Sequence, residues 1–475
     1  MPSQTYTHDV IVIGAGAAGL TAAGGCALFG LKVALVERGA FGGECLNNGC
    51  VPSKALIAAA RRAHEVRRGA RFGVSVEGTR VDWAGVRGHV EASIATIAPH
   101  DDPARFEAMG CEVFRGEARL TGSHEVEVAG QRLAAPRIVL ALGSEPAVPP
   151  VEGLASVPFL TNENLFQLDR LPERLIVLGG GAVGMEMAQA FCRLGSAVTL
   201  VERGEVLSRD DRESAAMAKA SLEADGVRFV SGTAVRATGT DGAVALTLDG
   251  GEVIEGSHVL VATGRKARGQ GMGLEELGVK FGTNGIAVDD RRRTSLSHIY
   301  AIGDCREGPR LTHVSGYEGS NVALEISLGV PTKVDWAALP WCTYTAPEVG
   351  QVGLTEAEAR EKFGDKVRIV REDFSHNDRA VTEGAMEGWL KLVMKGRKLV
   401  GASVCGEGAG DMLLPLAQTI TGKAGTFALG SAIIAYPTRG EITKAGAFAA
   451  WEPLVFSAPV KRIARALAAL RRKFG

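Results

Sequence analysis

The sequence predicts an α/β protein of several domains, and three observations support this prediction. A unit made of an apolar strand, a glycine-rich turn and an alanine-rich helix occurs twice in the 475 residues. At about 100–200 residues per domain, this length corresponds to two to four domains. The 62 glycines make up about 13% of the chain, nearly twice the usual share of about 7%. Without a Gly-X-Y period, this excess indicates tight turns and close approach of backbone to ligands.

The repeated unit defines two equivalent sites. The first copy is DVIVIGAGAAGL, followed by the strand KVALVERG, and the second is RLIVLGGGAVGMEMA, followed by AVTLVERG. In each copy an acidic residue follows the first glycine by 23 positions. At an offset of 165 residues, the matching positions are Gly14, Gly16, Gly19 and Glu37 in the first copy and Gly179, Gly181, Gly184 and Glu202 in the second.

This spacing is typical of dinucleotide binding. The first glycine permits a sharp strand-to-helix turn, the second lets the backbone approach a pyrophosphate, and the third allows close packing of helix on strand. The free N–H groups and partial positive charge at the helix N-terminus attract the phosphates. The acid at the end of the second strand accepts hydrogen bonds from a ribose hydroxyl. We therefore expect two Rossmann-like domains, each with one nucleotide cofactor.

The acid of the second copy bears on cofactor choice. A carboxylate at Glu202 pairs with a free 2′-hydroxyl and repels a 2′-phosphate, which favours NADH. Arg203 follows directly, and a guanidinium there can accommodate that phosphate. NADH is the expected nucleotide, with NADPH as the alternative.

A pair of cysteines follows the first unit in the segment GGECLNNGCVPSKALIAAARRA. Cys45 and Cys50 are separated by four residues, and Pro52 begins a helix that carries Lys54. The pair can close a disulfide or act as a dithiol, and a helix N-terminus favours thiolate at the nearer cysteine. Zinc would need four ligands, and no second Cys or His pair of suitable spacing accompanies the first, so no metal site is expected. Redox chemistry is the preferred interpretation, and two packed thiols are the alternative.

With these residues in view, the chain is similar to a known family. GGECLNNGCVPSK resembles the redox-active disulfide of the class I FAD-dependent pyridine nucleotide-disulfide oxidoreductases, which include dihydrolipoamide dehydrogenase, glutathione reductase and mercuric reductase. The segments VLVATGRKAR, HIYAIGDC, LTHVSGYEG and LPWCTYTAPEVGQVGLTE resemble further motifs of that family. The resemblance implies a C-terminal α+β dimerisation domain after the two Rossmann-like domains, and a homodimer.

The resemblance also implies domain limits. Residues 1–150 would form the first segment of the FAD-binding domain, and 151–270 the NAD(P)-binding domain. Residues 271–338 would return to the FAD-binding and central region. The dimerisation domain would span 339–475 and include a basic amphipathic tail from about residue 452.

Residue roles follow from the same resemblance. Cys45 would be the interchange thiol that attacks substrate, Cys50 the thiolate against the flavin, and Lys54 with Glu186 an ion pair beside it. FAD would be held by Gly14, Gly16, Gly19, Glu37, Gly143, Asp304 and His313. The nicotinamide cofactor would be held by Gly179, Gly181, Gly184, Glu202 and Gly264.

The implied function is electron transfer between NAD(P)H, FAD and the Cys45–Cys50 disulfide, and from there to or from a small thiol, disulfide or thiol-bound substrate. One alternative is an FAD-dependent NAD(P)H reductase of a metal ion, quinone or other non-disulfide acceptor. Another is a flavoprotein redox sensor or an adaptor at the membrane surface. The motifs do not choose the acceptor or the direction of electron flow.

The chain departs from several relatives at the proton-transfer position. Where lipoamide and glutathione enzymes have a histidine supplied by the other subunit, the segment AYPTRGE places Tyr436, while Glu441 keeps the acid. Tyrosine titrates near 10 and is a poor base at pH 7. Mercuric reductases also have tyrosine here, but they need a C-terminal cysteine pair, and the last cysteine of this sequence is Cys405. We therefore expect a mercuric-reductase-like branch whose acceptor its motifs do not fix, and a true mercuric reductase is not the favoured interpretation.

The tail VKRIARALAALRRKF has six Lys or Arg and no acid. Its apolar residues Ile463, Leu467, Leu470 and Phe474 recur at helical spacing, which predicts a basic amphipathic helix. Three roles are open for this helix: packing on its own subunit, binding an anionic membrane surface, or docking on an acidic protein.

Composition excludes other classes. The 53 Lys and Arg nearly balance the 54 Asp and Glu, which argues against a nucleic-acid-binding protein. Eight cysteines are too few for a disulfide-stapled secreted scaffold. We find no signal-peptide pattern at the N-terminus and no apolar run of membrane-spanning length, so a cytoplasmic protein is expected.

Overall fold

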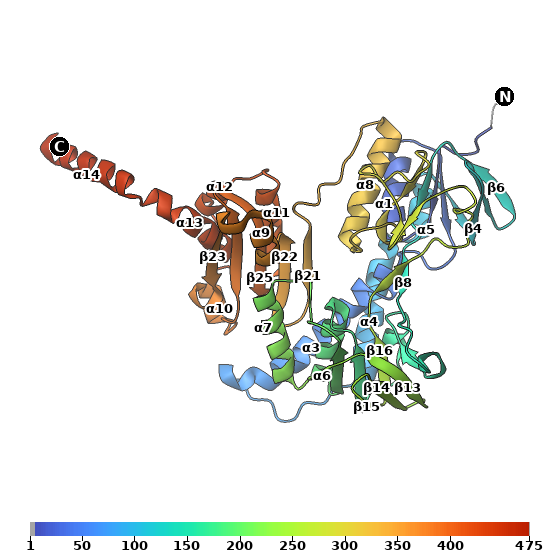
Figure 1. Ribbon diagram of the computed structural model, residues 1–475, viewed down its shortest axis with the longest axis horizontal. Helices are drawn as coiled ribbons and strands as arrows, with labels where there is room; N and C mark the ends of the chain where they lie inside the picture. The colour runs from blue at the N-terminus through green and yellow to red at the C-terminus, as the bar shows by residue number, and fades with distance from the viewer. Residues whose placement is uncertain (1–4, 475) are drawn as a thin grey trace. The chain divides into compact units, whose positions relative to one another are not determined.

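The computed structural model of the chain describes residues 5–474. These residues form two compact units (Figure 1). The first unit contains the described residues up to Arg203 together with Gly226–Val334, and the second contains Gly204–Asp225 and the residues from Asp335 onward.

The first unit begins with a five-stranded parallel sheet. Its strand order is β20–β7–β1–β2–β3, with β1 (Val10–Ile13), β2 (Val33–Glu37), β3 (Cys111–Arg115), β7 (Ile138–Leu140) and β20 (Ile299–Ala301). All four residues of β1 are buried, which explains why this strand is apolar without alternation. The glycine turn after β1 lies at the carboxyl end of the central strand, where parallel sheets bind ligands.

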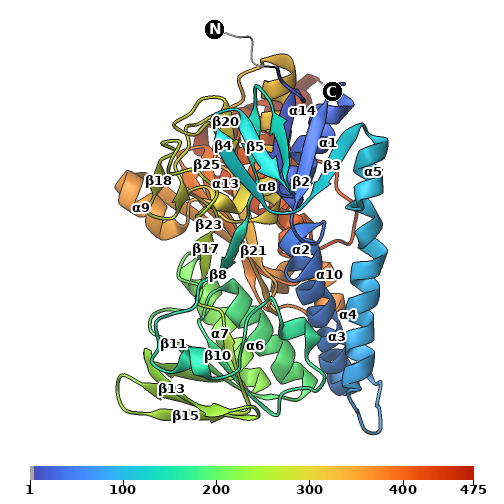
Figure 2. The ribbon, with the colours of Figure 1, turned by 90° about the vertical axis from the view of Figure 1, so that its right-hand side faces the viewer.

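Both faces of this sheet are covered. Val10 and Val12 face a layer of helices in which α1 (Ala17–Leu28) packs against α8 (Thr312–Leu328). Ile11 and Ile13 face the antiparallel sheet of β4 (Ala118–Gly122), β5 (Glu125–Val128) and β6 (Gln131–Ala134). A helix layer, a parallel sheet and a β-meander therefore form three layers around two hydrophobic cores (Figure 2).

The second sequence copy builds the same plan. Its parallel sheet has the order β12–β11–β10–β16–β9, with β9 (Phe159–Leu160), β10 (Arg174–Leu178), β11 (Ala197–Glu202), β12 (Arg228–Ser231) and β16 (His258–Val261). Ile176 and Leu178 pack in one core with the antiparallel strands β13 (Ala234–Thr240), β14 (Ala243–Leu248) and β15 (Val253–Gly256). Helix α6 (Ala182–Leu194) contacts β10 and β11. The prediction of two Rossmann-like α/β layers is confirmed.

Helix α3 (Cys50–Arg68) packs on α6, the helix that covers the second parallel sheet. It also packs against α4 (Trp83–Ile97), and Figure 2 shows α3 and α4 running together. Helix α3 begins at Cys50, one of the predicted redox cysteines, so this packing positions the helix that carries Cys50. Short elements of this unit are α2 (Gly43–Asn47), α5 (Pro103–Ala108), β8 (Ser144–Pro146), β17 (Arg265–Ala267), β18 (Phe281–Gly282) and β19 (Gly285–Ile286).

The second unit is an α+β domain, as predicted for the C-terminal part of the chain. Its antiparallel sheet has the order β21–β22–β25–β24–β23, with β21 (Pro340–Thr343), β22 (Glu348–Gly353), β23 (Val367–Asp373), β24 (Trp389–Lys395) and β25 (Lys398–Gly406). Strands β24 and β25 form an antiparallel hairpin in which Lys395 pairs with Lys398. The helices of this unit are α7 (Arg212–Asp225), α9 (Glu356–Phe363), α10 (Asp378–Thr382), α11 (Leu413–Ile420), α12 (Thr426–Ser431), α13 (Glu441–Val455) and α14 (Ala458–Phe474).

A buried lysine ties α7 to this sheet. Lys391 on β24 is 2% exposed, and its ammonium donates to Asp211 at 3.0 Å, Glu213 at 2.8 Å and Glu356 at 3.1 Å. The three carboxylates come from the start of α7 and the start of α9. A buried ammonium needs such partners, because an unpaired charge in the interior is costly.

The tail forms the predicted helix, α14. From Ala458 to Arg472 every side chain is exposed, so these residues do not pack on the rest of the second unit. In Figure 1 the helix projects from the rest of its unit. No helix in the described part of the chain is both long and apolar enough to cross a membrane.

Candidate functional site

The first glycine turn joins β1 to α1. Gly14 has φ +106°, a left-handed conformation that favours glycine, and a β-carbon here would overlap the Ala141 carbonyl oxygen. A β-carbon on Gly19 would overlap the Gly14 carbonyl oxygen, which shows how closely α1 approaches the strand. Gly16 has more room, since the nearest atom to a β-carbon there is the Gly43 Cα at 3.7 Å.

The acid of the first copy is held at this turn. One oxygen of Glu37 accepts a hydrogen bond from the Ala15 N–H at 2.6 Å, and the other accepts one from the Gly39 N–H at 2.7 Å. These backbone donors fix the carboxylate at the end of β2, beside the glycine turn. A half-buried carboxylate in this orientation keeps lone pairs for a ribose hydroxyl.

The residues of this turn fit the pyrophosphate of a dinucleotide. Helix α1 has Gly16 as its N-cap, no side-chain cap and no acid in its first turn. Its first N–H groups therefore lack side-chain acceptors, and no carboxylate in that turn repels an anion. Space at Gly16 lets a phosphate approach the backbone. The structure thus provides what binding of FAD at the first copy requires.

The second turn repeats this geometry. Gly179 has φ +115° and would clash with the Ala262 carbonyl oxygen if it carried a β-carbon, whereas Gly181 has no atom within 4 Å of that position. A β-carbon on Gly184 would overlap the Gly179 carbonyl oxygen. Helix α6 has Gly181 as its N-cap, again with no acid in its first turn. The Gly180 N–H donates to Glu202 at 2.7 Å, so the second turn fits a nicotinamide dinucleotide as well.

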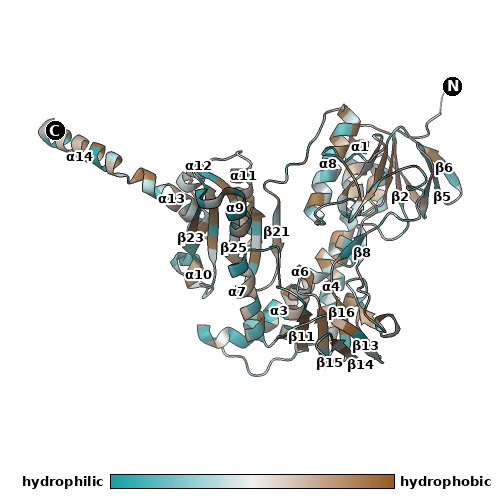
Figure 3. Ribbon diagram, viewed as in Figure 1, coloured by the Kyte–Doolittle hydropathy of each residue, from teal (hydrophilic) through white to brown (hydrophobic). Residues whose placement is uncertain are grey.

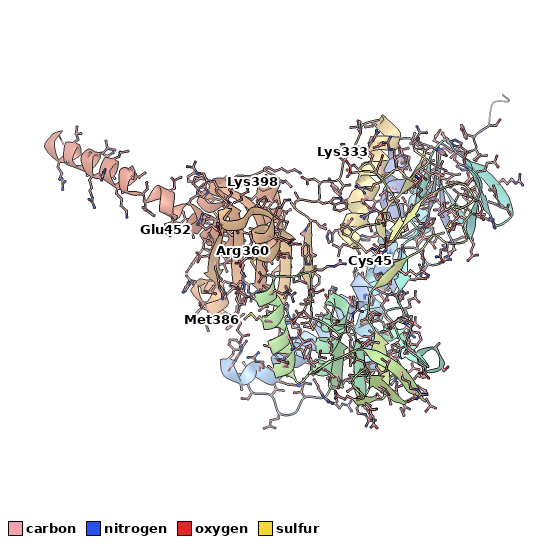
Figure 4. The ribbon with its side chains drawn as sticks, in the orientation of Figure 1. Cys45, Lys333, Arg360, Met386, Lys398 and Glu452 are labelled. Atoms are coloured by element: carbon pink, nitrogen blue, oxygen red, sulfur yellow. The ribbon has the colours of Figure 1, made fainter. Side chains whose placement is uncertain are left out.

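The two predicted redox cysteines lie together in the first unit (Figure 4 labels Cys45). Cys45 is on the short helix α2, and Cys50 is the first residue of α3. Both are free thiols in the structure, and a hydrogen bond joins their side chains. The Cys50 sulfur also lies 3.1 Å from the Thr312 hydroxyl, the first residue of α8. Helices α2 and α3 carry the two cysteines, and α8 contributes the hydroxyl of Thr312, which lies 262 residues after Cys50 in the sequence.

Their environments separate the two thiols chemically. The pKa of Cys50 is lowered to about 6, chiefly by the hydrogen bond from the Cys45 thiol and also by the Thr312 hydroxyl and the Lys54 ammonium, against the opposing effect of burial. The same hydrogen bond, together with burial, raises the pKa of Cys45. At neutral pH the reduced pair therefore holds a thiolate at Cys50 and a proton on Cys45.

The predicted ion pair is present. Lys54, one helical turn after Cys50 on α3, donates to Glu186 of α6 at 2.9 Å. Glu186 is 4% exposed and Lys54 is 39% exposed, so the carboxylate is buried while the ammonium reaches the surface of the chain. The pair joins the redox helix to the helix of the second nucleotide turn, and it places a fixed positive charge near Cys50.

A polar network surrounds Asp304, the predicted flavin contact. The Ser144 hydroxyl donates to the Asp304 carboxylate at 2.8 Å and accepts from the Arg265 guanidinium at 2.7 Å. Arg265 also pairs with Glu44, the residue before Cys45. The Asn162 side chain is a further donor to Glu44. The network thus connects the Asp304 loop to the cysteine segment.

Sequence reasoning missed this network and the Thr312 contact. Arg265 directly follows Gly264, and Glu44 directly precedes Cys45, so both stood next to residues that were singled out. Their pairing joins positions 221 residues apart, and Cys50 and Thr312 are 262 residues apart. For the pair of Arg265 and Glu44, the only local signal was that each is a charged residue next to a predicted site residue.

The remaining predicted cofactor residues lie near these elements. Gly143 and Gly264 precede β8 and β17, which pair with each other, and backbone hydrogen bonds join Arg268 to Gly143 and Ala147 to Gly264. His313 is the second residue of α8, next to Thr312, and its side chain is exposed. All cofactor residues predicted from the sequence belong to the first unit.

Tyr436 and Glu441 belong to the second unit. Tyr436 is 71% exposed, and its hydroxyl donates to Asp378 at 2.8 Å. This hydrogen bond raises the pKa of Tyr436, so the phenol keeps its proton at neutral pH. Glu441 begins α13 and accepts from the Thr438 N–H at 3.1 Å, which caps the loop that carries Tyr436. The tyrosine and the acid thus have different partners.

None of the other six cysteines is spaced in the sequence as a redox pair would be. Four of them, Cys26, Cys111, Cys305 and Cys405, are buried, and burial raises the pKa of each. Cys192 and Cys342 are half-buried. Among the residues that the structure describes, no group of three or more His, Cys, Asp or Glu side chains is arranged to hold a metal ion.

Comparison with known proteins matches this geometry. The family profile described as pyridine nucleotide-disulphide oxidoreductase matches residues 8–319, and the dimerisation-domain profile of the same family matches residues 339–446. Matched curated relatives number in the hundreds.

Two kinds of enzyme recur among the relatives. A mercuric reductase of Streptomyces lividans is 35% identical over 433 residues, covering 88% of this chain and 91% of the relative. A dihydrolipoyl dehydrogenase of Thermus scotoductus is 38% identical over 461 residues, covering 92% and 95%. A mercuric reductase of Lysinibacillus sphaericus is 34% identical, covering 86% and 76%.

A solved structure shares the fold. The HOCl-induced flavoprotein disulfide reductase RclA from Escherichia coli superposes with a TM-score of 0.82, covering 93% of this chain and 99% of that one, at 24% identity. The α/β fold of two nucleotide-binding layers and a C-terminal α+β domain is therefore the fold of a known flavoprotein reductase.

Proposed function

The chain belongs to the pyridine nucleotide-disulphide oxidoreductase family, and from this premise we propose that it delivers electrons from NAD(P)H, through the Cys45–Cys50 pair, to a small disulfide or thiol-bound acceptor. Members of this family are flavoproteins that use FAD and NAD(P)H, and the dimerisation domain supports a homodimer. The acceptor is part of the proposal, since the relatives include reductases of different substrates.

The observation that supports the proposal most strongly is the arrangement of the cysteine pair, in which the Cys45 thiol is hydrogen-bonded to Cys50 and the Thr312 hydroxyl lies 3.1 Å from the Cys50 sulfur. The chemistry that a bound flavin supplies is acceptance of a hydride and delivery of two electrons. Gly14, Gly16, Gly19 and Glu37 would hold its adenine-dinucleotide part, and Asp304 its ribityl chain. The chain itself stores the two electrons as the reduced pair, with Cys50 as thiolate and Cys45 as thiol.

Reduction of an acceptor disulfide then proceeds by thiol–disulfide exchange. The proton of Cys45 shifts along the hydrogen bond to Cys50, and the Cys45 thiolate attacks one acceptor sulfur, so that a mixed disulfide forms and one thiolate leaves. Cys50 next attacks Cys45, closes the Cys45–Cys50 disulfide and releases the second acceptor thiol with its proton. The acceptor gains two electrons and one proton from the pair, and the first acceptor thiolate to leave takes its proton from solvent.

Lys54 and Glu202 have supporting roles. The Lys54 ammonium stabilises the Cys50 thiolate and is itself oriented by Glu186. Glu202 is held at the second glycine turn by the Gly180 N–H, where its carboxylate favours a free ribose 2′-hydroxyl. We therefore propose NADH as the preferred reductant, and a lower KM for NADH than for NADPH would support this choice.

Tyr436 favours a second candidate, a non-disulfide acceptor such as a quinone or a metal ion. Its hydroxyl is bonded to Asp378 and keeps its proton at neutral pH, so it is a poor base for repeated thiol exchange. Acceptors that do not form a mixed disulfide with Cys45 do not need such a base.

Substitution of the interchange thiol distinguishes the two candidates. The holoenzyme, Cys45→Ser and the control Cys342→Ser would be assayed with NADH and a panel of lipoamide, glutathione disulfide, other small disulfides, mercuric ion and quinones. Disulfide chemistry predicts that Cys45→Ser abolishes turnover of the best acceptor while Cys342→Ser retains it. Full turnover by Cys45→Ser would overturn the proposal in favour of the second candidate.

A further inference from the structure

Helix α14 is a surface that the redox function does not use. Its apolar side chains are open to solvent, with Val460 44%, Ile463 60%, Leu467 51% and Leu470 56% exposed. Figure 3 shows apolar and polar residues interleaved along the helix, as expected when the two kinds lie on different faces. Large apolar residues gathered on one exposed element mark an interaction surface.

The two kinds of residue separate around the helix axis. At about 100° per residue, Val460, Ile463, Leu467 and Leu470 fall within a sector of about 80°. On the same geometry Lys461, Arg462, Arg465 and Arg472 lie on the opposite side, spread over about 100°. We call the first set the apolar stripe and the second the basic face. Ala464, Ala466, Ala468 and Ala469 fill much of the remaining surface with small side chains.

Charge defines the kind of partner. Six of the 53 Lys and Arg residues lie in α14, and none of the 54 Asp and Glu residues does. A second copy of this helix contains no acid, so two such helices paired through their apolar stripes would leave both basic faces without a carboxylate partner from the other helix. A partner that fits both features offers an apolar interior beneath a negatively charged surface.

We propose that α14 lies flat on a membrane rich in anionic lipids, with the apolar stripe at the boundary of headgroups and acyl chains and the basic face toward the headgroups. Helices with this division of residues bind in the plane of the interface. Each basic residue near an anionic leaflet adds to the attraction, and Arg471, at the edge of the apolar stripe, can extend its guanidinium to the headgroups. This inference goes beyond the proposed function, because it assigns a place of action and no step of catalysis.

The junction with α13 suits such an arrangement. Pro453 lies inside α13, the helix ends at Val455, and α14 begins at Ala458. Near this break Leu454 is 43% and Phe456 51% exposed, so apolar surface continues toward the start of α14. At 1.5 Å per residue its 17 residues are about 25 Å long. The break between α13 and α14 and the length of α14 therefore suit a helix that lies along a membrane surface.

Vesicle flotation with the full-length holoenzyme tests the proposal. We expect the protein to float with vesicles of phosphatidylcholine and phosphatidylglycerol, to remain unbound with phosphatidylcholine alone, and to lose binding as salt screens the charges. The double variant Ile463→Ser/Leu467→Ser should need at least about tenfold more anionic lipid for half-binding. The variant Arg462→Gln/Arg465→Gln should weaken binding to the anionic vesicles in the same direction.

Matched controls lie elsewhere in the second unit. Leu414 is 66% exposed, so Leu414→Ser removes an exposed apolar side chain outside the helix, and Lys398→Gln removes an exposed cation (Lys398 is labelled in Figure 4). Both should bind vesicles as the unaltered protein does. Because all these positions are exposed, thermal unfolding should change little and will reveal any variant that fails to fold.

Three results would overturn the proposal. The first is no flotation with anionic vesicles at low salt, and the second is equal flotation by Ile463→Ser/Leu467→Ser. The third is that the unaltered protein does not bind vesicles while the Ile463→Ser/Leu467→Ser variant no longer forms a dimer. That result would show that the apolar stripe makes a contact between subunits.

Discussion

At the scale of single residues, the chemistry depends on which cysteine carries the negative charge. The geometry assigns the thiolate to Cys50 and the proton to Cys45, because Cys50 accepts the hydrogen bond within the pair and has Thr312 and Lys54 beside it. The spacing of the two cysteines predicted a redox pair, and the resemblance predicted their roles. The Thr312 contact was not predictable, because it joins residues 262 positions apart that have no common pattern.

Lys54 gives a prediction in pH dependence. Cys50 has a pKa lowered to about 6, so the reduced holoenzyme should gain a thiolate as pH rises through about 6 and lose it below. Lys54→Met removes a favourable charge and leaves Glu186 nearby, so the midpoint should rise by about 1 or more. The measurement is the ultraviolet thiolate absorbance against pH, with Cys50→Ser as blank. Arg62→Gln, an exposed change on the same helix, is the control, and a midpoint unchanged in Lys54→Met would contradict the assignment.

Tyr436 gives a prediction in substrate range. Its hydroxyl keeps its proton at neutral pH, so turnover of lipoamide or glutathione disulfide should be slow. Tyr436→His introduces a group that titrates near neutrality and should raise kcat/KM for these disulfides at least about tenfold near pH 7.5. Tyr436→Phe removes the hydroxyl and should leave the slow rate unchanged. Loss of activity in Tyr436→Phe, with no gain in Tyr436→His, would show that the tyrosine itself moves the proton.

At the scale of elements, the two strand–turn–helix copies were the most predictable part of the molecule. Each copy has local requirements, a left-handed turn at Gly14 or Gly179 and room at Gly16 or Gly181, and these leave a residue pattern. Which unit an element packs in depends on contacts between residues far apart in the sequence, and these contacts leave no such pattern. Helix α7 falls inside the range 151–270 in sequence, yet it packs in the second unit, so the domain limits drawn from the sequence stay a prediction.

The second glycine turn allows binding and stability to be separated. Gly181→Ala places a β-carbon in open space, so the free energy of unfolding should change by less than about 1 kcal/mol while NADH binding weakens about tenfold or more. Gly184→Ala would force a β-carbon into the Gly179 carbonyl oxygen and should destabilise the protein by more than about 2 kcal/mol. Thermal unfolding and nucleotide titration check both. Undiminished NADH affinity in Gly181→Ala would contradict the binding role.

Lys391 gives a prediction about the contact of α7 with the sheet of its unit. Lys391→Met leaves Asp211, which is 5% exposed, near Glu213 and Glu356 without the shared cation. We expect a loss of about 2–4 kcal/mol in stability, less than for a fully buried pair because two of the carboxylates reach solvent. Chemical unfolding measures it, with exposed Lys398→Met as control. A loss below about 0.5 kcal/mol would show that the cluster contributes little.

At the scale of the whole molecule, one chain has two nucleotide-binding turns, a cysteine pair and a dimerisation domain. The sequence predicted this combination because each part has a local signature, and the family assignment agrees with it. The acceptor was not predictable, because no local motif in the sequence identifies it.

The central claim is that electrons from the nicotinamide cofactor reach Cys45 and Cys50. Anaerobic titration of the holoenzyme with NADH, followed by alkylation and mass spectrometry, tests it most directly. We predict that two new reactive thiols per chain will be found, at Cys45 and Cys50, together with a long-wavelength thiolate–flavin absorption that Cys50→Ser lacks. Flavin bleaching without new thiols at these two positions would contradict the claim.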